Sequence, residues 1–147
     1  MYKNILIPID GSECSIYALK EGIVFAKNVD ANITFLCAIE DPMSVGYGAP
    51  EIVVSSADFY DTAKQKGSES LTTAKQLGTE AGINIKTRLI EKKHPATAIL
   101  EAEEEFDLVI MGTHGRRGIR RFFMGSVTEE VIRRATKPYM VIPMQTE

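Results

Sequence analysis

The feature that most constrains the fold of this chain is the regular alternation of short apolar runs with longer segments of helical periodicity. Strict alternation of this kind predicts an α/β fold, in which an open, mainly parallel, doubly wound sheet carries helices on both faces. Because crossovers between parallel strands are right-handed, few topologies remain. Ligands are expected at the carboxyl ends of the strands, where the strand order reverses. The strands are predicted at residues 5–9, 33–39, 83–89, 108–111 and 139–142.

Four helices are predicted between these strands. The Ser12 hydroxyl can cap the first, which runs to about Val29 with Ile16, Leu19, Ile23 and Ala26 on one face. The second covers about 57–81 and is followed by Gly82, a suitable C′ residue; Pro95 opens the third. The fourth begins near Ser126 and is stopped by Lys137 and Pro138. Residues 40–56 are predicted to form a long polar loop of the kind that is usually functional or mobile.

Composition bounds the class of protein. A chain of 147 residues, 44% apolar and 25% charged, has the size and composition of one globular domain, so residues 1–147 are predicted to form a single domain. A formal charge of −3 gives no reason to expect nucleic acid as a partner. No apolar run approaches the roughly 20 residues that cross a bilayer, and the chain begins with a strand-like segment, so no membrane insertion and a cytoplasmic location are expected. Cys14 and Cys37 are isolated and are expected to be buried.

The residues after the fourth predicted strand combine closely spaced glycines with the start of a helix. Gly112 and Gly115 allow positive φ and close approach of a ligand to the backbone, whose N–H groups can bind an anion. Gly125 and Ser126 precede the fourth helix, whose N-terminus carries unsatisfied N–H groups. Ser126 and Glu129 have the spacing of a capping box, and the serine hydroxyl can also donate to a phosphate oxygen. The segment therefore predicts a polyphosphate site. It lacks GxxxxGKS/T and GxGxxG, so it is neither a P-loop nor a standard dinucleotide site.

Several residues near this segment have two interpretations. Arginines 116, 117, 120 and 121 could form a solvated face, although Arg116 and Arg117 are nearest to the glycines and are expected to include the phosphate contacts. Asp10 could be a turn residue, but the ligand interpretation is favoured because it lies at the expected binding edge. His114 is expected to pack or to bond the backbone. No nucleophile shares a motif with either histidine, and the two histidines do not have the spacing of metal ligands.

The spacing G-x2-G-x9-G-S/T, met by Gly112, Gly115, Gly125 and Ser126, resembles the ATP-binding signature of the universal stress protein family. The opening segment 5–12 and the closing segment 137–142 match the family pattern in order. The resemblance implies a five-stranded sheet of order 3-2-1-4-5 and a homodimer through Tyr139–Ile142, with a tetramer left open. It also implies an ATP site with Mg²⁺, in which Pro8 and Asp10 flank the adenosine and the Ala38 backbone contacts adenine. The other expected site residues are Ser12, Met111, Gly112, Thr113, His114, Gly115, Arg116, Arg117, Gly125, Ser126 and Val127.

The function expected from the motif and the resemblance is nucleotide-dependent regulation without catalysis. We expect no catalytic residue, and no metal site made by protein side chains alone. In this interpretation nucleotide occupancy orders residues 40–56 and changes self-association or docking on an unidentified protein, such as a membrane transporter. The alternative is a slow ATP hydrolase or an adenylyl-transferring enzyme on the same fold, with Mg²⁺ near Asp10. One departure from the family pattern is Lys92-Lys93-His94 before Pro95, where small or acidic residues are common.

Overall fold

A computed structural model of the chain describes residues 1–41, 50–114 and 124–144, with the backbone alone described over 50–56. Strands and helices alternate along the described chain, as predicted. The strands are β1 (Asn4–Pro8), β2 (Asn32–Ile39), β3 (Ile85–Glu91), β4 (Leu108–Gly112) and β5 (Tyr139–Ile142). The helices are α1 (Glu13–Val29), α2 (Pro50–Glu80), α3 (Pro95–Ala102) and α4 (Ser126–Arg134), with a 3-10 turn, η2 (Glu103–Glu105), after α3.

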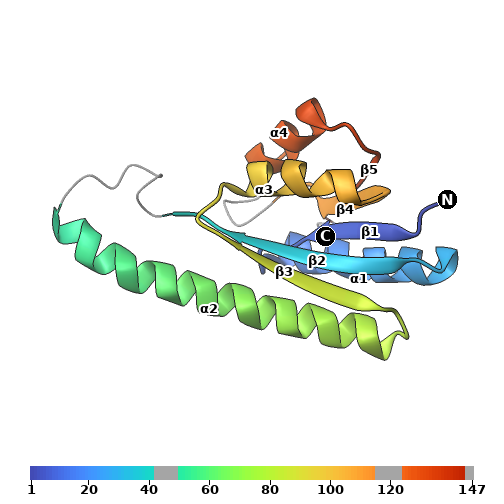
Figure 1. Cartoon of the computed structure of the whole chain (residues 1–147), viewed down its shortest axis with the longest axis horizontal. Coiled ribbons are helices and arrows are strands. Elements are labelled where there is room, and N and C mark those ends of the chain that lie inside the picture. Colours follow the sequence, from blue (N-terminus) through green and yellow to red (C-terminus); the bar gives the residue numbers. More distant parts are fainter. Residues whose placement is uncertain (42–49, 115–123, 145–147) are drawn as a thin grey trace.

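The five strands form one parallel sheet of order β3-β2-β1-β4-β5, which confirms the expected topology. Ile5 of β1 pairs with Ile33 of β2 on one side and with Leu108 of β4 on the other. Helices α1 and α2 cover one face of the sheet, and α3 and α4 cover the other (Figure 1). The chain first moves outward from β1 through β2 to β3 and then crosses to β4, so the strand order reverses between β1 and β4.

Alternating side chains on the central strands divide the core into two layers. Ile5 and Ile7 pack with Leu19 of α1 and Leu71 of α2, whereas Leu6 between them packs with Ile99 of α3. This alternation follows from the two-residue period of a strand. Because both faces of the sheet are covered, β1 reads as a continuous apolar run. Both cysteines are buried, as expected.

The predicted bounds of two elements, α2 and β3, were wrong. Helix α2 begins at Pro50, not near residue 57, so the second part of the predicted 40–56 loop is helical, and residues 42–49 lie outside the described chain. Proline suits the first turn of a helix because its fixed φ and missing N–H cost nothing there. Strand β3 begins at Ile85, two residues later than predicted, because the N–H of Ile83 donates to the Gly78 carbonyl. Gly82, with φ of 84°, donates to Thr79, and the two bonds form a Schellman motif.

A buried carboxylate holds the connection between α4 and β5. Glu103, 2% exposed, accepts hydrogen bonds from the backbone N–H and hydroxyl of Thr136 and from the hydroxyl of Tyr139. Burial, followed by the hydrogen bond with Glu103, raises the pKa of Tyr139. The edge strand is thereby fastened at its first residue. No helix in the described part of the chain is both long and apolar enough to cross a membrane.

Candidate functional site

The ends of β1, β2, β4 and β5 and the starts of α1 and α4 lie at the carboxyl edge of the sheet, where the strand order reverses between β1 and β4. Backbone hydrogen bonds join them. The N–H of Ile9 donates to Leu36 of β2 at 2.8 Å, and the N–H of Gly125, before α4, donates to Thr113 at 2.6 Å. The N–H of Thr113 in turn donates to Ile142 of β5 at 3.1 Å. The predicted site residues that the structure describes lie on these segments: Pro8, Asp10, Ser12, Ala38, Met111, Gly112, Thr113, His114, Gly125, Ser126 and Val127.

The turn after β1 is closed by its own side chains. The N–H of Ser12 donates to Asp10 Oδ1 at 2.9 Å, and Gly11 between them has φ of 81°. Ser12 is the N-cap of α1, and its Oγ accepts from the N–H of Ser15 at 3.2 Å. Asp10 therefore acts as a turn residue through its Oδ1 atom, which is one of the two roles that the sequence left open. The predicted capping of α1 by Ser12 is confirmed. Ser15, whose Oγ accepts from the N–H of Asp10, was not anticipated.

Gly112 serves the packing of α1 against β4. A Cβ at this position would lie 2.6 Å from Cys14 Sγ, closer than real Cβ atoms approach, and 3.1 Å from the Cys14 carbonyl oxygen, which is tighter than most real contacts. The φ of Gly112 lies outside the left-handed region. The expectation that Gly112 supplies positive φ was therefore wrong, because the residue is the last of strand β4 and is glycine to admit the neighbouring helix.

The start of α4 has no side-chain cap. Its N-cap is Gly125, with φ −62° and ψ 154°, and it makes no side-chain cap hydrogen bond. The predicted capping box was wrong, because Ser126 is the first helical residue and Glu129 instead lies 3.6 Å from Arg133. Ser126 is exposed. The first N–H groups of a helix have no partner within it, and the N-cap side chain that satisfies them at α1 is lacking here.

Tertiary hydrogen bonds hold this uncapped helix in place. The buried hydroxyl of Thr128 donates to the Gly112 carbonyl at 2.8 Å and so ties α4 to the end of β4. Next to it, Thr113 Oγ1 lies 2.9 Å from His114 Nδ1 and 3.9 Å from Cys14 Sγ. The contact of His114 with the Thr113 hydroxyl is one between side chains, so the packing or backbone-bonding role expected from the sequence stays a prediction. The role of Thr128 was not predicted from the sequence. A threonine at an otherwise apolar position of a helix could have indicated a buried hydroxyl with a hydrogen-bond partner.

An apolar surface lines the same edge on the α3 and α4 side. Met111 is buried in the core cluster of that side, and Ala38 and Val127 pack against it while remaining partly exposed. Three residues predicted from separate segments are therefore brought into one cluster. Such a surface next to exposed N–H groups suits a ligand with a flat apolar part and an anionic part.

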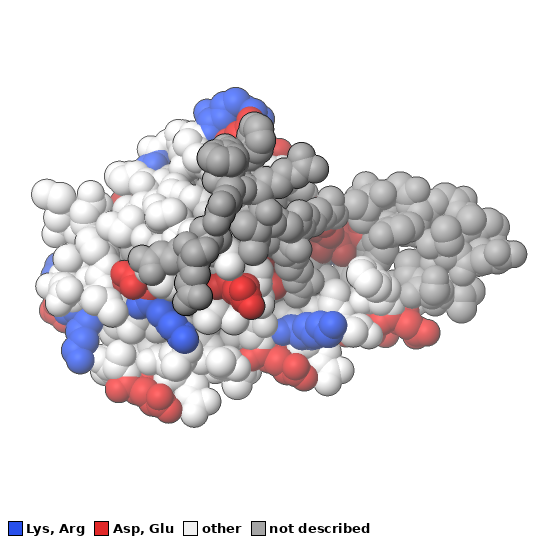
Figure 2. Space-filling view, turned by 180° about the vertical axis from the view of Figure 1, so that it is seen from behind, with Lys and Arg blue, Asp and Glu red and all other residues white. Residues whose placement is uncertain are grey.

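The charges around the site are mixed in sign. Acidic and basic side chains are interspersed over the described part of the face in Figure 2. No group of three histidine, cysteine, aspartate or glutamate side chains in the described ranges could hold a metal ion. Gly115, Arg116 and Arg117 lie outside the described residues, so the expected arginine contacts stay a prediction.

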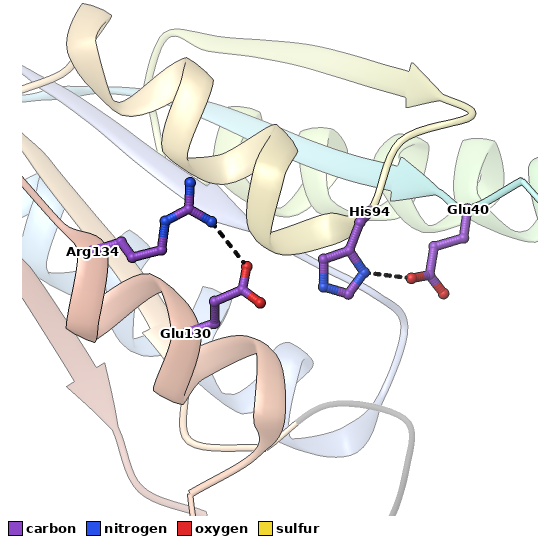
Figure 3. Close-up of polar contacts among 4 residues, drawn as sticks. All are labelled: Glu40, His94, Glu130 and Arg134. Atoms are coloured by element: carbon purple, nitrogen blue, oxygen red, sulfur yellow. Dashed lines mark hydrogen bonds and ion pairs between the residues drawn. The ribbon is translucent and has the colours of Figure 1, made fainter. Parts of the chain in front are cut away.

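A polar bridge that the sequence did not indicate closes one end of this edge. His94, the N-cap of α3, places its Nδ1 2.6 Å from Oε1 of Glu40, the residue after β2 (Figure 3). Neither residue has a motif around it, and the pair is 54 residues apart in sequence. Only the pairing of β2 with β3 brings them together.

Comparison with known proteins gives consistent results. The model of a family described as the universal stress protein family matches residues 1–143. A universal stress protein of Methanocaldococcus jannaschii is 35% identical over 147 residues, covering 97% of this chain and 82% of the relative. The solved structure of a universal stress protein from Lactobacillus plantarum superposes with a TM-score of 0.83 at 25% identity, covering 96% of this chain and 97% of the other.

Two further structures of this fold were solved with nucleotides. A universal stress protein in complex with cAMP has a TM-score of 0.70 and 22% identity, covering 96% of this chain and 97% of the other. One from Archaeoglobus fulgidus in complex with dAMP has a TM-score of 0.63 and 20% identity, covering 96% and 98%. At these identities the likeness shows the shared fold alone.

Proposed function

Since this chain belongs to the universal stress protein family, we propose that it binds an adenine nucleotide, ATP with Mg²⁺, at the carboxyl edge of β1, β2 and β4. The adenine would lie against Ala38 and Met111, with Pro8 and Asp10 beside the adenosine. The phosphates would accept from N–H groups at the start of α4, next to Gly125 and Ser126. Support from other proteins comes from the two neighbours of the same fold that were solved with cAMP and dAMP.

The observation that carries this proposal is the uncapped start of α4 beside a partly exposed apolar cluster. A helix start that lacks a side-chain cap needs an acceptor from water or from a ligand. Phosphate suits this position because the helix dipole places partial positive charge there. The site fits a nucleotide on this observation. Mg²⁺, when bound, would neutralise phosphate charge, and it would be held through the phosphates themselves.

We propose that the nucleotide acts as a regulatory ligand. Thr113 bonds both Gly125, at the phosphate end, and Ile142, at the end of β5. A displacement of Gly125 at the start of α4 would therefore be transmitted to the edge strand β5 by the two backbone hydrogen bonds of Thr113. If Tyr139–Ile142 forms a homodimer interface, occupancy of the site would change self-association, and through it docking on a partner protein such as a transporter.

The first experiment is native mass spectrometry of the purified protein, which reports bound nucleotide and subunit number together. Gly125→Val is the sharper variant, because φ −62° and ψ 154° suit any residue, so the fold should persist while the new side chain crowds the phosphates. We expect at least about a tenfold loss of ATP affinity by calorimetry, as for one lost charge-assisted hydrogen bond of roughly 1.5–3 kcal/mol. Ser68→Ala, at an exposed serine of α2, is the control for mutation at a helix surface. Unchanged affinity in Gly125→Val would contradict the phosphate assignment.

The enzyme alternative has a separate test. Multiple-turnover phosphate release at about 1 s⁻¹ or faster, the low end of ordinary enzyme rates, would favour a hydrolase. Release far slower than this is expected if the nucleotide acts by occupancy.

A further inference from the structure

The bridge between Glu40 and His94 lies at the base end of the proposed nucleotide site. Glu40 follows Ala38 by two residues, so the two lie on the same side of the extended chain. Ala38 packs against the cluster that contains Met111. A backbone bond at 3.3 Å, from the N–H of Lys93 to the Ile39 carbonyl, runs beside the side-chain bridge. Together they fasten the end of β2 to the turn before α3.

Several other charged groups near this bridge pair with side chains other than His94. Lys93 pairs with Glu101 along α3, and Arg134 pairs with Glu130 on α4, as Figure 3 shows for the second pair. Glu91 at the end of β3 accepts from Tyr60 and pairs with Lys64 of α2. Lys92 belongs to the same turn, and Asp41 follows Glu40 in sequence. The His94 imidazole itself places its Nδ1 2.6 Å from Oε1 of Glu40.

The strength of the bridge depends on the charge of the imidazole. A neutral histidine makes a single neutral-to-charged hydrogen bond with Glu40, whereas a protonated one makes an ion pair and a charge-assisted bond of greater strength. Histidine ordinarily changes charge near pH 6.5, within the range of cellular conditions. The side chain of His94 is 48% exposed, so protons reach it freely.

We propose that His94 is a positioning residue of the nucleotide site, which makes nucleotide affinity depend on its protonation. The proposal rests on the function proposed above. Protonated His94 holds Glu40, and therefore the backbone at Ala38, in the position that receives the base. Binding and protonation are linked equilibria, so a proton that favours the nucleotide-bound form must itself be bound more tightly when nucleotide is present. The negative charge of the phosphate acts in the same direction.

The test is the affinity for cAMP, measured by calorimetry from about pH 5.5 to about pH 8, on either side of the histidine range. This probe is used because its phosphodiester keeps one negative charge throughout, whereas the terminal phosphate of ATP would titrate. We expect binding to tighten about fivefold toward low pH, the lower end of usual coupling energies. His94→Asn keeps a side chain that can bond Glu40 but cannot titrate, so its profile should be flat. Glu40→Gln should reduce the slope.

Glu101→Gln is the matched control, because it removes the neighbouring pair with Lys93 and leaves the bridge intact, so its slope should equal that of the wild type. A flat wild-type profile, or a slope that survives in His94→Asn, would overturn the proposal while leaving nucleotide binding in place. Failure of the wild type to bind cAMP, dAMP or ATP at any pH would remove both the proposed function and this inference. Two further measurements keep the test valid if His94→Asn misfolds. His94→Gln is a second variant that cannot titrate, and its affinity profile should also be flat. Titration of the imidazole proton signals of the wild type by NMR, with and without cAMP, should show His94 binding its proton more tightly when cAMP is present.

Discussion

The N-termini of α1 and α4 lie at the same edge of the sheet and differ in one respect. Their N-cap residues have almost the same backbone conformation, with φ −71° and ψ 160° at Ser12 and φ −62° and ψ 154° at Gly125. The Ser12 hydroxyl accepts from the first turn of α1, whereas α4 has no side-chain cap hydrogen bond. Both helices therefore begin with the backbone conformation of an N-cap, but only α1 has an N-cap side chain that can accept a hydrogen bond.

This difference separates a helix start that is satisfied from one that is available to a ligand. At α1, Asp10 and Ser12 close the turn, and Cys14 packs against Gly112. Helix α4 is instead held by contacts farther along, from Thr128 to Gly112 and from Glu103 to Thr136. Because these tertiary bonds fix its position, α4 can leave its first N–H groups to an outside acceptor.

The largest expected effect comes from removing the anchor beyond α4. Glu103→Ala would remove the buried acceptor of three hydrogen bonds, those from the N–H and hydroxyl of Thr136 and from the hydroxyl of the partly buried Tyr139. At about 1 kcal/mol for each lost hydrogen bond, we expect the free energy of unfolding to fall by about 3 kcal/mol in urea denaturation. Tyr139→Phe removes a single donor and should cost about 1 kcal/mol. Equal losses for the two variants would show that the carboxylate does not act as a shared acceptor.

Gly112→Val should have the next largest effect, acting on α1 and not on the proposed phosphate site. The new side chain would collide with Cys14, and overpacking of this kind costs about 1–3 kcal/mol. A double-mutant cycle with Gly112→Ala and Cys14→Ala checks the cause by measuring unfolding free energies. Removal of the sulfur should recover part of the loss, but not all, because the Cys14 carbonyl oxygen remains 3.1 Å away. Strictly additive losses would rule out the contact.

Ser12→Ala should destabilise the protein by about 1 kcal/mol, the usual cost of losing an N-cap side chain. Ser126→Ala is the matched comparison, since Ser126 is exposed within the first turn of α4 and makes no cap. Its unfolding free energy should stay within about 0.5 kcal/mol of the wild type. Thermal or urea denaturation measures both. Equal costs for the two alanine variants would remove the distinction between the two helix starts.

The smallest expected change in stability comes from giving α4 the cap that α1 has. Gly125→Ser places a hydroxyl on a backbone that already has the right conformation, and serine gains a few tenths of a kcal/mol over glycine at an N-cap. The same hydroxyl would compete with a phosphate for the first N–H groups, so ATP affinity should fall as stability rises. Calorimetry measures the ATP affinity, and urea denaturation of the same sample measures the free energy of unfolding. An increase in both would mean that the nucleotide does not use these groups.

Much of the fold could be predicted because local patterns and the global topology agree. The alternation of apolar runs and helical periodicity identified the parallel sheet, and Ser12, Gly82 and Pro95 marked helix ends through their own backbone and side-chain chemistry. The resemblance supplied the strand order. The start of α2 was missed because residues 50–56 carry a serine-rich, β-branched sequence that does not by itself favour a helix.

Residue types and spacing thus determined which segments would form the carboxyl edge and which of their side chains could meet a ligand. The three-dimensional packing decided how those residues are used. Gly112 is glycine because α1 approaches within contact distance, and His94 meets Glu40 because β2 and β3 pair. Ser126 does not cap because α4 begins one residue earlier than the predicted capping box implies, with Gly125 as its N-cap. Periodicity and capping act within a few residues of the chain, whereas these contacts join segments separated by many residues, and only the folded packing brings their atoms within reach.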